Sequence, residues 1–473
     1  REANLNPIVV DVASFTLQNC FELNYGISSE SIALLNIGAA ISTITIMTNG
    51  VSTFTRDVTL GGNAFTEDIA DHAIKWIRQQ KSLMPDKPFF VYWAPGATHA
   101  PHHVAPEWSD KYRGAFDDGW DATRERTFAR QKELRVIPAD AELTERHAEI
   151  PAWDDVPDEM KPVLARQMEV YAGFLDHTDH HLGRLIDAVE DLGVLDDTLI
   201  FYIIGDNGAS AEGTPNGCFN EIAVLNGMGT IETPEFLMSK IDDFGGPEAS
   251  NHYAVGWAHA MDTPYQWTKQ VASHWGGTRN GTIVHWPKGI QAKGEIRSQF
   301  SHVIDVAPTV LEAAKIPVPK LVNGVEQRPM DGVSMAYTFD EKNADAPSEH
   351  TTQYFEMIGD RAIYHDGWIL STKVMRPPWD NSGKSYGDPS TWPWELYDLA
   401  TDIGEQHNLA REWPGVVPSH GTRLPAAAAA VLVNRRCRRF PAIPESATAG
   451  RFRTPKRSAL RATHSHSASV GRR

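Results

Sequence analysis

The stretch Leu199–Ser210, "LIFYIIGDNGAS", carries the main indication of the fold. Mostly apolar residues run into a glycine, and an aspartate and an asparagine follow at Asp206 and Asn207. A short, continuously apolar run of this kind is typical of a strand that is buried in a parallel sheet. Because ligands of such sheets bind beyond the carboxyl ends of the strands, the stretch predicts both a buried strand and a site at its end.

Strands and helices alternate on both sides of this stretch. Residues 66–81 and 161–193 place apolar side chains at helical spacing, and Thr66 is the expected N-cap of the first helix. Residues 87–95 and 280–287 are short apolar runs that predict further strands. The alternation predicts an α/β fold, with a mainly parallel sheet covered by helices on both faces.

The chain divides into four regions of different character. Residues 64–347 hold the α/β domain, and residues 348–412 predict a small, mainly antiparallel C-terminal α+β subdomain. Residues 1–63 suggest short strands without organised alternation, so we treat them as an atypical N-terminal segment. Residues 413–473 are basic and rich in Arg, Ala and Ser, which predicts a disordered tail.

Composition narrows the possible partners. The chain of 473 residues is 41% hydrophobic and 22% charged, and its net charge of −17 argues against nucleic acid as the main partner. No apolar run is long enough for a transmembrane helix, so we expect no membrane partner. Three widely spaced cysteines and the lack of a convincing signal peptide favour a cytoplasmic location. Compartment and oligomeric state stay open.

Polar residues follow two of the predicted strands. Asp206 and Asn207 offer the hard oxygen ligands that Ca²⁺ or Mg²⁺ prefers, although D-N-G is also a common turn sequence. His99 follows the other strand, where an imidazole could contact an oxyanion or protonate a leaving oxygen. A surface histidine in a loop is the alternative for His99. We expect His102 and His103 to be loop residues rather than catalysts.

A third group lies just before the strand at 280–287. Lys269, His274 and Arg279 surround a pair of glycines in "KQVASHWGGTRNG". Cations beside such a permissive turn can form an anion pocket, although an ordinary basic loop has the same composition. Together with His99 and an oxygen-ligated cation, this group suits the transfer of a sulfuryl or phosphoryl group.

The order of these motifs resembles that of the type I sulfatases, specifically the bacterial arylsulfatases of the alkaline phosphatase superfamily. The resemblance covers about residues 65–412 and rests on five segments: "KPFFVYWAPGATHAPHH", "LIFYIIGDNGAS", "KQVASHWGGTRNG", "SHVIDVAPTVLEAA" and "ELYDLATDIGEQHNLA". It implies hydrolysis of small-molecule sulfate esters with bound calcium, on a large α/β domain with a small C-terminal subdomain.

The resemblance also implies roles for single residues. By position, Asp206 and Asn207 match the second pair of metal ligands in the family. His99 matches the histidine that contacts the sulfate and the leaving oxygen. Lys269 matches the sulfate-binding lysine, and His274 could share that role.

The chain departs from the sulfatase pattern in its N-terminal part. The family converts a Cys or Ser in a C/S-x-P/A-x-R motif to formylglycine, the nucleophile, and no cysteine or serine of this chain satisfies that motif. Of the first metal pair only Asp11 is found. The domain at 64–347 is therefore expected to be incomplete, like that of a truncated sulfatase, with a weakened calcium site.

Two functions follow from these observations. The first is a sulfuric ester hydrolase of the arylsulfatase type that is impaired or inactive in this chain. The alternative is a non-catalytic sulfatase remnant or anion-binding protein. Hydrolysis of phosphate or phosphonate esters is less favoured, because a two-metal site would need more Asp and His than these loops supply.

Overall fold

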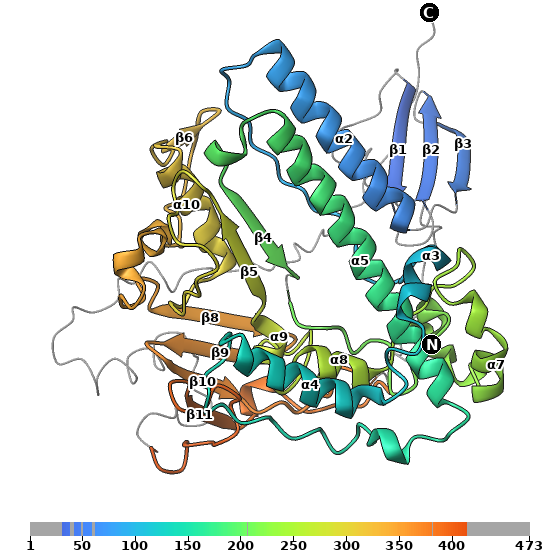
Figure 1. Ribbon diagram of the computed structural model, residues 1–473. Coiled ribbons are helices and arrows are strands. Elements are labelled where there is room, and N and C mark those ends of the chain that lie inside the picture. Colours follow the sequence, from blue (N-terminus) through green and yellow to red (C-terminus); the bar gives the residue numbers. More distant parts are fainter. Residues whose placement is uncertain are drawn as a thin grey trace, which may run out of the picture.

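The computed structural model describes residues 31–37, 42–48, 51–58, 62–205, 207–380 and 382–413 (Figure 1). Asp206 and nearly all of the predicted tail lie outside the described residues, and side chains are described from Thr66 onward. Within this part of the chain, the structure contains no helix that could cross a membrane by its length and hydropathy.

The α-helices are concentrated in the first two thirds of the chain. They are α2 (Gly62–Leu83), α3 (Pro106–Ser109), α4 (Gly119–Glu133), α5 (Lys161–Asp191), α6 (Glu221–Ala223), α7 (Pro234–Ser239), α8 (Val255–Met261), α9 (Trp275–Thr278) and α10 (Val306–Ala313). Short helical turns connect them: η1 (Asp110–Tyr112), η2 (Trp153–Asp155), η3 (Leu195–Asp197), η4 (Val224–Met228), η5 (Gly229–Ile231), η6 (Ile241–Asp243), η7 (Val303–Asp305), η8 (Ala336–Phe339), η9 (Glu341–Asn343) and η10 (Pro389–Thr391).

The strands form four separate sheets. One sheet contains β1 (Ser31–Ile37), β2 (Ser42–Thr48) and β3 (Val51–Val58), and a second pairs β4 (Ile200–Ile204) with β5 (Gly281–His285). The others are the pair β6 (Leu321–Val322) and β7 (Val325–Glu326), and the sheet of β8 (Thr352–Met357), β9 (Asp360–His365), β10 (Trp368–Thr372) and β11 (Trp394–Asp398).

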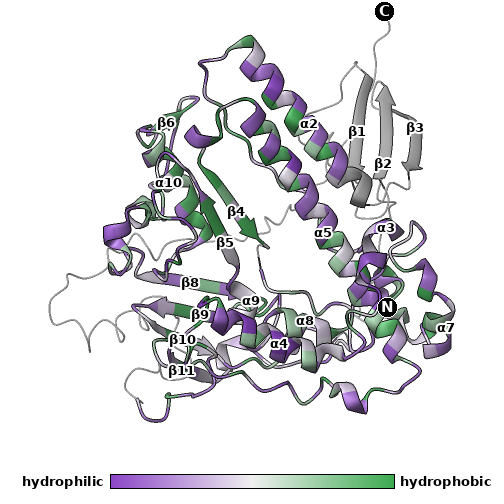
Figure 2. Ribbon diagram, viewed as in Figure 1, coloured by the Kyte–Doolittle hydropathy of each residue, from purple (hydrophilic) through white to green (hydrophobic). Residues whose placement is uncertain are grey.

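The strand pairings confirm one expectation and leave another unconfirmed. The C-terminal sheet, in the order β11-β10-β9-β8, is antiparallel as predicted. The mainly parallel core is not confirmed, because all pairings between named strands of the described residues are antiparallel, including β4 with β5. Figure 2 shows that β4 and β5 carry mostly hydrophobic residues, as the sequence indicated.

The two long helices agree with their predicted positions and pack along each other (Figure 1). Ile77 of α2 meets Leu185 and Val189 of α5 in a buried apolar cluster. Gly193 lies just beyond α5 with a φ of 67°, a conformation that glycine adopts without steric cost. The predicted N-cap is wrong, because α2 already begins at Gly62 and Thr66 lies inside the helix.

The apolar run at 87–95 is not a strand. The segment is irregular, and no strand pairs with it in the described part of the chain. Phe89, Val91 and Trp93 pack against the cluster between α2 and α5, whereas the intervening Phe90 and Tyr92 are exposed. The alternation of the side chains is that of a strand, but without a hydrogen-bonded neighbour the run does not become one.

The largest core joins α5, α8 and the segments around α4. Trp120, Trp153 and Trp257 meet there in edge-to-face and tilted contacts, with ring centroids 4.8 to 5.8 Å apart. This core fixes the segments on either side of α5 and α8. The candidate site is built from the loops that precede α3, follow β4 and flank α8.

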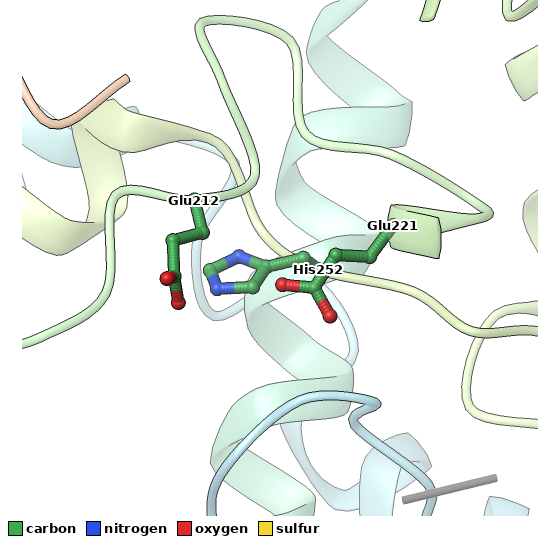
Figure 3. A group of neighbouring side chains, drawn as sticks. All are labelled: Glu212, Glu221 and His252. Atoms are coloured by element: carbon green, nitrogen blue, oxygen red, sulfur yellow. The ribbon is translucent and has the colours of Figure 1, made fainter. Parts of the chain in front are cut away.

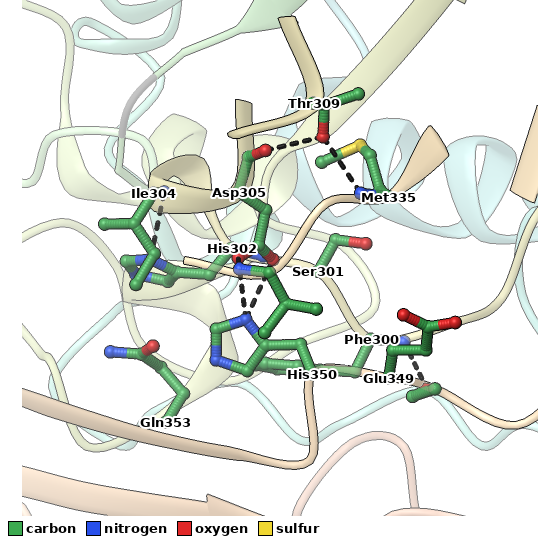
Figure 4. A network of polar contacts seen from close by, with 12 residues as sticks. Phe300, Ser301, His302, Ile304, Asp305, Thr309, Met335, Glu349, His350 and Gln353 are labelled. Atoms are coloured by element: carbon green, nitrogen blue, oxygen red, sulfur yellow. Dashed lines mark hydrogen bonds and ion pairs between the residues drawn. The ribbon is translucent and has the colours of Figure 1, made fainter. Parts of the chain in front are cut away.

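A polar network joins α10 to the C-terminal sheet (Figure 4). The buried carboxylate of Asp305 accepts hydrogen bonds from the backbone N–H groups of His302 and Val333, each at 2.8 Å. His350, which precedes β8, donates from Nδ1 to the same carboxylate at 2.8 Å and 2.9 Å. The network therefore connects the segment before α10 to the residue that lies two positions before β8.

Candidate active site

His99 and Lys269 lie in contact although 170 residues separate them in the sequence. The distance from Lys269 Nζ to His99 Nε2 is 3.0 Å. His99 Nδ1 lies 2.8 Å from the carbonyl oxygen of Ala100, so Nδ1 carries the proton and Nε2 accepts from the ammonium group of Lys269. His99 is exposed, whereas the side chain of Lys269 is only 16% exposed.

Backbone contacts hold the loop of Lys269 against the loop that follows β4. The N–H of Lys269 donates to Ala209 O at 3.0 Å, and the N–H of Gly208 donates to Gly277 O at 3.3 Å. A Cβ on Gly208 would lie 1.7 Å from Gly276 O, so only glycine permits this approach. The backbone of the loop after β4 therefore helps to position Lys269.

Glu212 is the anionic partner of Lys269. Its Oε2 accepts from Lys269 Nζ at 3.0 Å and from Ser210 Oγ at 2.8 Å, and its Oε1 accepts from Gln270 Nε2 at 2.7 Å. Burial disfavours the charged carboxylate, but the hydrogen bond and charge of Lys269, with Ser210 and Gln270, outweigh it and lower the pKa of Glu212 to about 2. The carboxylate is therefore ionised at neutral pH and holds Lys269 in place.

Glu221 and His252 stand next to Glu212 (Figure 3). Each of the three offers a ligand atom, and these atoms lie within 4.8 Å of one another. Burial lowers the pKa of His252 to about 4, so its imidazole is neutral near pH 7. Burial, followed by the charge of Glu212, raises the pKa of Glu221.

Comparison with known sequences decides the family. The profile described as "Sulfatase" matches residues 21–316, more than half of the chain. The chain belongs to the sulfatase family.

Two curated sulfatases are similar to it. An uncharacterized sulfatase of Schizosaccharomyces pombe (strain 972 / ATCC 24843) is 29% identical over 361 residues, which cover 73% of this chain and 58% of that protein. An arylsulfatase of Klebsiella aerogenes is 27% identical over 298 residues, which cover 62% of this chain and 58% of that protein. The sulfatase chain described here thus spans little more than half the length of either relative.

Solved structures show a weaker likeness. Ps i-CgsB is 17% identical with a TM-score of 0.43, and the match covers 78% of this sulfatase and 57% of that chain. The phosphonate monoester hydrolase SpPMH from Silicibacter pomeroyi is 13% identical with a TM-score of 0.30, covering 68% and 48%. The family assignment rests on the sequence.

Of the two expected calcium ligands in this sulfatase, Asp206 and Asn207, the structure describes only Asn207. Asn207 lies in the bend after β4, directly before Gly208, and Asp206 is outside the described residues. The donor chemistry suits calcium, since a carboxylate and an amide oxygen are hard ligands. Two ligands are few against the 6–8 oxygens that Ca²⁺ takes in proteins, however. The expectation of a weakened site is thus unchanged.

His274 does not join His99 and Lys269 in the described structure. It is buried, its Nδ1 lies 2.9 Å from Ser273 Oγ, and its Nε2 lies 3.6 Å from Glu395 Oε2 in β11. Although burial alone would lower the pKa of His274, Glu395 and other nearby carboxylates raise it overall. The imidazole therefore connects α9 to the C-terminal sheet, and the predicted sulfate contact of His274 finds no support in its neighbours.

In the part of the chain that the structure describes, Arg279, His102 and His103 contact other parts of the fold rather than Lys269. Arg279 lies over the ring of Trp275, 4.2 Å from its centroid. His102 and His103 belong to a loop, as expected, but both are buried. His102 stacks on Tyr253 with centroids 5.0 Å apart. None of these contacts places Arg279 or His103 beside Lys269 within the described residues.

Three residues of the site were not found from the sequence: Glu212, Glu221 and His252. The sequence could have pointed to Glu212, because this residue lies two positions after the stretch Leu199–Ser210. Glu221 and His252 carry no local pattern and become neighbours only through the fold.

Proposed function

We propose that this sulfatase-family chain carries the site of a sulfuric ester hydrolase of the arylsulfatase type, which is impaired or inactive in this chain, and that it binds sulfate esters at Lys269 and His99. The supporting observation is the contact between Lys269 Nζ and His99 Nε2 at 3.0 Å. An ammonium group and an imidazole at this spacing can bind adjacent oxygens of one sulfate ester, the non-bridging oxygens and the oxygen of the departing alcohol.

The neighbours of the pair define what each group can do. Ala100 O accepts the Nδ1 proton of His99, and Nε2 on the other side of the ring faces Lys269. His99 is therefore the candidate general acid for the leaving oxygen. Glu212 fixes the ammonium group of Lys269 but also competes with a bound anion for it.

The proposal includes calcium at Asp206 and Asn207. Bound calcium would polarise a sulfate oxygen as a Lewis acid. Asn207 and the carboxylate of Asp206 would hold it, and with two protein ligands we expect weak binding.

We expect little or no turnover from this chain alone. Its sequence lacks the C/S-x-P/A-x-R motif, and loss of a nucleophile typically costs several orders of magnitude in rate. The same observation favours the second candidate function, anion binding without catalysis. The two candidates differ only in the chemical step and not in the binding of the anion.

Titration calorimetry with sodium sulfate tests the binding step. We expect saturable binding by the full chain, weakened about 10-fold or more in Lys269→Ala because a charge-assisted hydrogen bond is lost. Lys288→Ala is the matched control, since Lys288 is an exposed lysine paired with Asp197 outside the site. Equal affinities of the full chain and Lys269→Ala would refute the proposed anion site.

A nitrophenyl sulfate assay with added calcium separates the two candidates. We expect no release of nitrophenol above background, which supports anion binding without catalysis. Turnover that is abolished by His99→Ala would instead establish a hydrolase and overturn the expected inactivity.

A further inference from the structure

Glu212, Glu221 and His252 come from three segments that the backbone holds together. Cys218 and His252 exchange two backbone hydrogen bonds of 3.0 Å, and the N–H of Glu221 donates to Ser250 O at 2.8 Å. These bonds fix Glu221 relative to His252. They do not depend on any side chain of the cluster.

Gly213 brings the third segment close. A Cβ on Gly213 would lie 2.0 Å from Tyr253 O and 2.6 Å from His252 Nδ1. Because Gly213 follows Glu212 directly, this contact seats the Glu212 carboxylate beside the imidazole. Figure 3 shows the ring of His252 between the two carboxyl groups, with its nitrogen-bearing edge turned toward Glu212.

The imidazole of His252 has a free lone pair that could bind a metal ion. His252 is 0% exposed, and its Nδ1 donates to Tyr253 O at 2.9 Å. This hydrogen bond leaves the lone pair on Nε2, which is buried and has no hydrogen-bond partner among the described residues. Metal-ligating histidines characteristically donate their other ring N–H to a carbonyl or carboxylate in this way.

The carboxylate of Glu221 also lacks a hydrogen-bond donor among the described residues. The side chain of Glu221 is buried as well. Buried polar groups are nearly always hydrogen-bonded, so the unpartnered Nε2 of His252, with the Glu221 carboxylate nearby, requires an explanation. A bound cation would satisfy both of them.

We propose that Glu212, Glu221 and His252 bind a divalent transition-metal ion of the zinc type. One imidazole and two carboxylates form a ligand set that suits zinc, with a further position open to water or a ligand. Atoms no more than 4.8 Å apart share a point within about 2.8 Å of each, and zinc bonds are about 2.0–2.1 Å long. Side-chain movements of less than about 1 Å therefore close the site.

Lys269 and the metal ion compete for Glu212. Lys269 Nζ lies 3.0 Å from Glu212 Oε2, so an ion on this carboxylate weakens the hold of Glu212 on the ammonium group. Metal binding would then release Lys269 toward a sulfate ester, a consequence that rests on the proposed function. The metal site itself does not rest on that function, and Lys269→Met should bind zinc at least as tightly as the unchanged protein.

Zinc titration of the full chain, after removal of metal with a chelator, tests the site. We expect one equivalent of zinc to bind and to raise the melting temperature. Glu221→Gln and Glu212→Gln should each weaken binding by about 100-fold or more, because each removes a direct ligand. Glu235→Gln changes the charge equally on the exposed surface of α7 and should bind zinc normally.

Glu221→Gln also distinguishes the loss of a metal ligand from the loss of the folded structure. It keeps the side-chain size and loses no hydrogen bond to the described residues, so the metal-free variant should be at least as stable as the unchanged protein. Saturable zinc binding that Glu221→Gln and Glu212→Gln both retain would overturn the proposal, as would the absence of saturable binding in the unchanged protein. Loss of binding in Asp206→Ala alone would place the ion at the strand end and also overturn it.

Discussion

Gly208 shows at the scale of one residue how the site depends on backbone approach. The loop after β4 and the loop of Lys269 touch through main-chain atoms, and Gly208 donates to Gly277 O at 3.3 Å. No side chain fits between these loops. The motif that suggested metal ligands at the strand end thus also contains the residue that brings Lys269 into place.

Gly208→Ala should disturb both stability and anion binding. The new Cβ would meet Gly276 O at 1.7 Å, a backbone atom that moves only with its loop. We expect a loss of about 2 kcal/mol or more in the free energy of unfolding by urea, together with weaker sulfate binding. Gly183→Ala is the control, because nothing lies within 4 Å of a Cβ there in α5, and it should stabilise the protein by about 0.5–1 kcal/mol. Equal effects of the two changes would contradict this account.

At the scale of elements, β4 and β5 differ from the expected buried strands. Ile203 and Ile204 of β4 and Ile283 of β5 are all more than a third exposed. Their apolar sequence is that of a strand covered on both faces, yet most residues of this pair are partly or largely exposed. The run at 87–95, which could have been a neighbouring strand, packs on α2 and α5 instead.

The exposure of β5 predicts a small effect of an apolar-to-polar change. Ile283→Thr keeps a β-branched side chain at a position that is 54% exposed, so we expect less than about 0.5 kcal/mol of destabilisation in urea unfolding. Ile77→Ala in α2, where the side chain is 1% exposed, should cost about 3 kcal/mol. A cost at Ile283 similar to that at Ile77 would show that this face is covered.

Local sequence patterns predicted the positions of helices and strands better than the pairing of the strands. Helical spacing located α2 and α5, because amphipathic periodicity is a property of the segment itself. Whether an apolar run such as 87–95 becomes a strand depends on a hydrogen-bonding neighbour, which its own sequence does not encode. Strand direction depends in the same way on distant residues, so the sequence of β4 alone did not show that its partner β5 is antiparallel.

The candidate site shows the same limit. His99 and Lys269 were predicted because each belongs to a recognisable motif, and the structure brings them to 3.0 Å. His274 belongs to the same motif as Lys269 but points toward Glu395, since neighbours in a loop can face opposite sides. Glu212 and His252 entered the site only through tertiary contacts.

For the whole molecule, Asp305 and His350 connect the segment before α10 to the C-terminal sheet (Figure 4). His350 donates to Asp305 from Nδ1 and to Thr352 O from Nε2 at 3.1 Å, so both nitrogens carry protons in the network. The hydrogen bond to Asp305 raises the pKa of His350. Burial opposes the charge of Asp305, but His350 and the backbone donors lower the pKa of Asp305 overall.

These shifts set a pH window for stability. Because the folded-state pKa of His350 is raised, its contribution is complete below the ordinary value of about 6.5 and is lost as the pH rises through the raised value. Because the pKa of Asp305 is lowered, its contribution is complete above about 3.9 and is lost as the pH falls further. The junction should therefore be strongest between about pH 4 and 6.5.

His350→Gln should remove the loss of stability that occurs as the pH rises above about 6.5. We expect the unchanged protein to lose stability in urea unfolding from pH 6 to pH 9, and the variant to be about 3 kcal/mol less stable at pH 6 with a flatter profile, because a buried pair loses its cation. His72→Gln removes an exposed histidine paired with Asp68 and should change stability by less than about 1 kcal/mol. Parallel pH profiles of the unchanged protein and His350→Gln would show that the ion pair does not hold the two parts together.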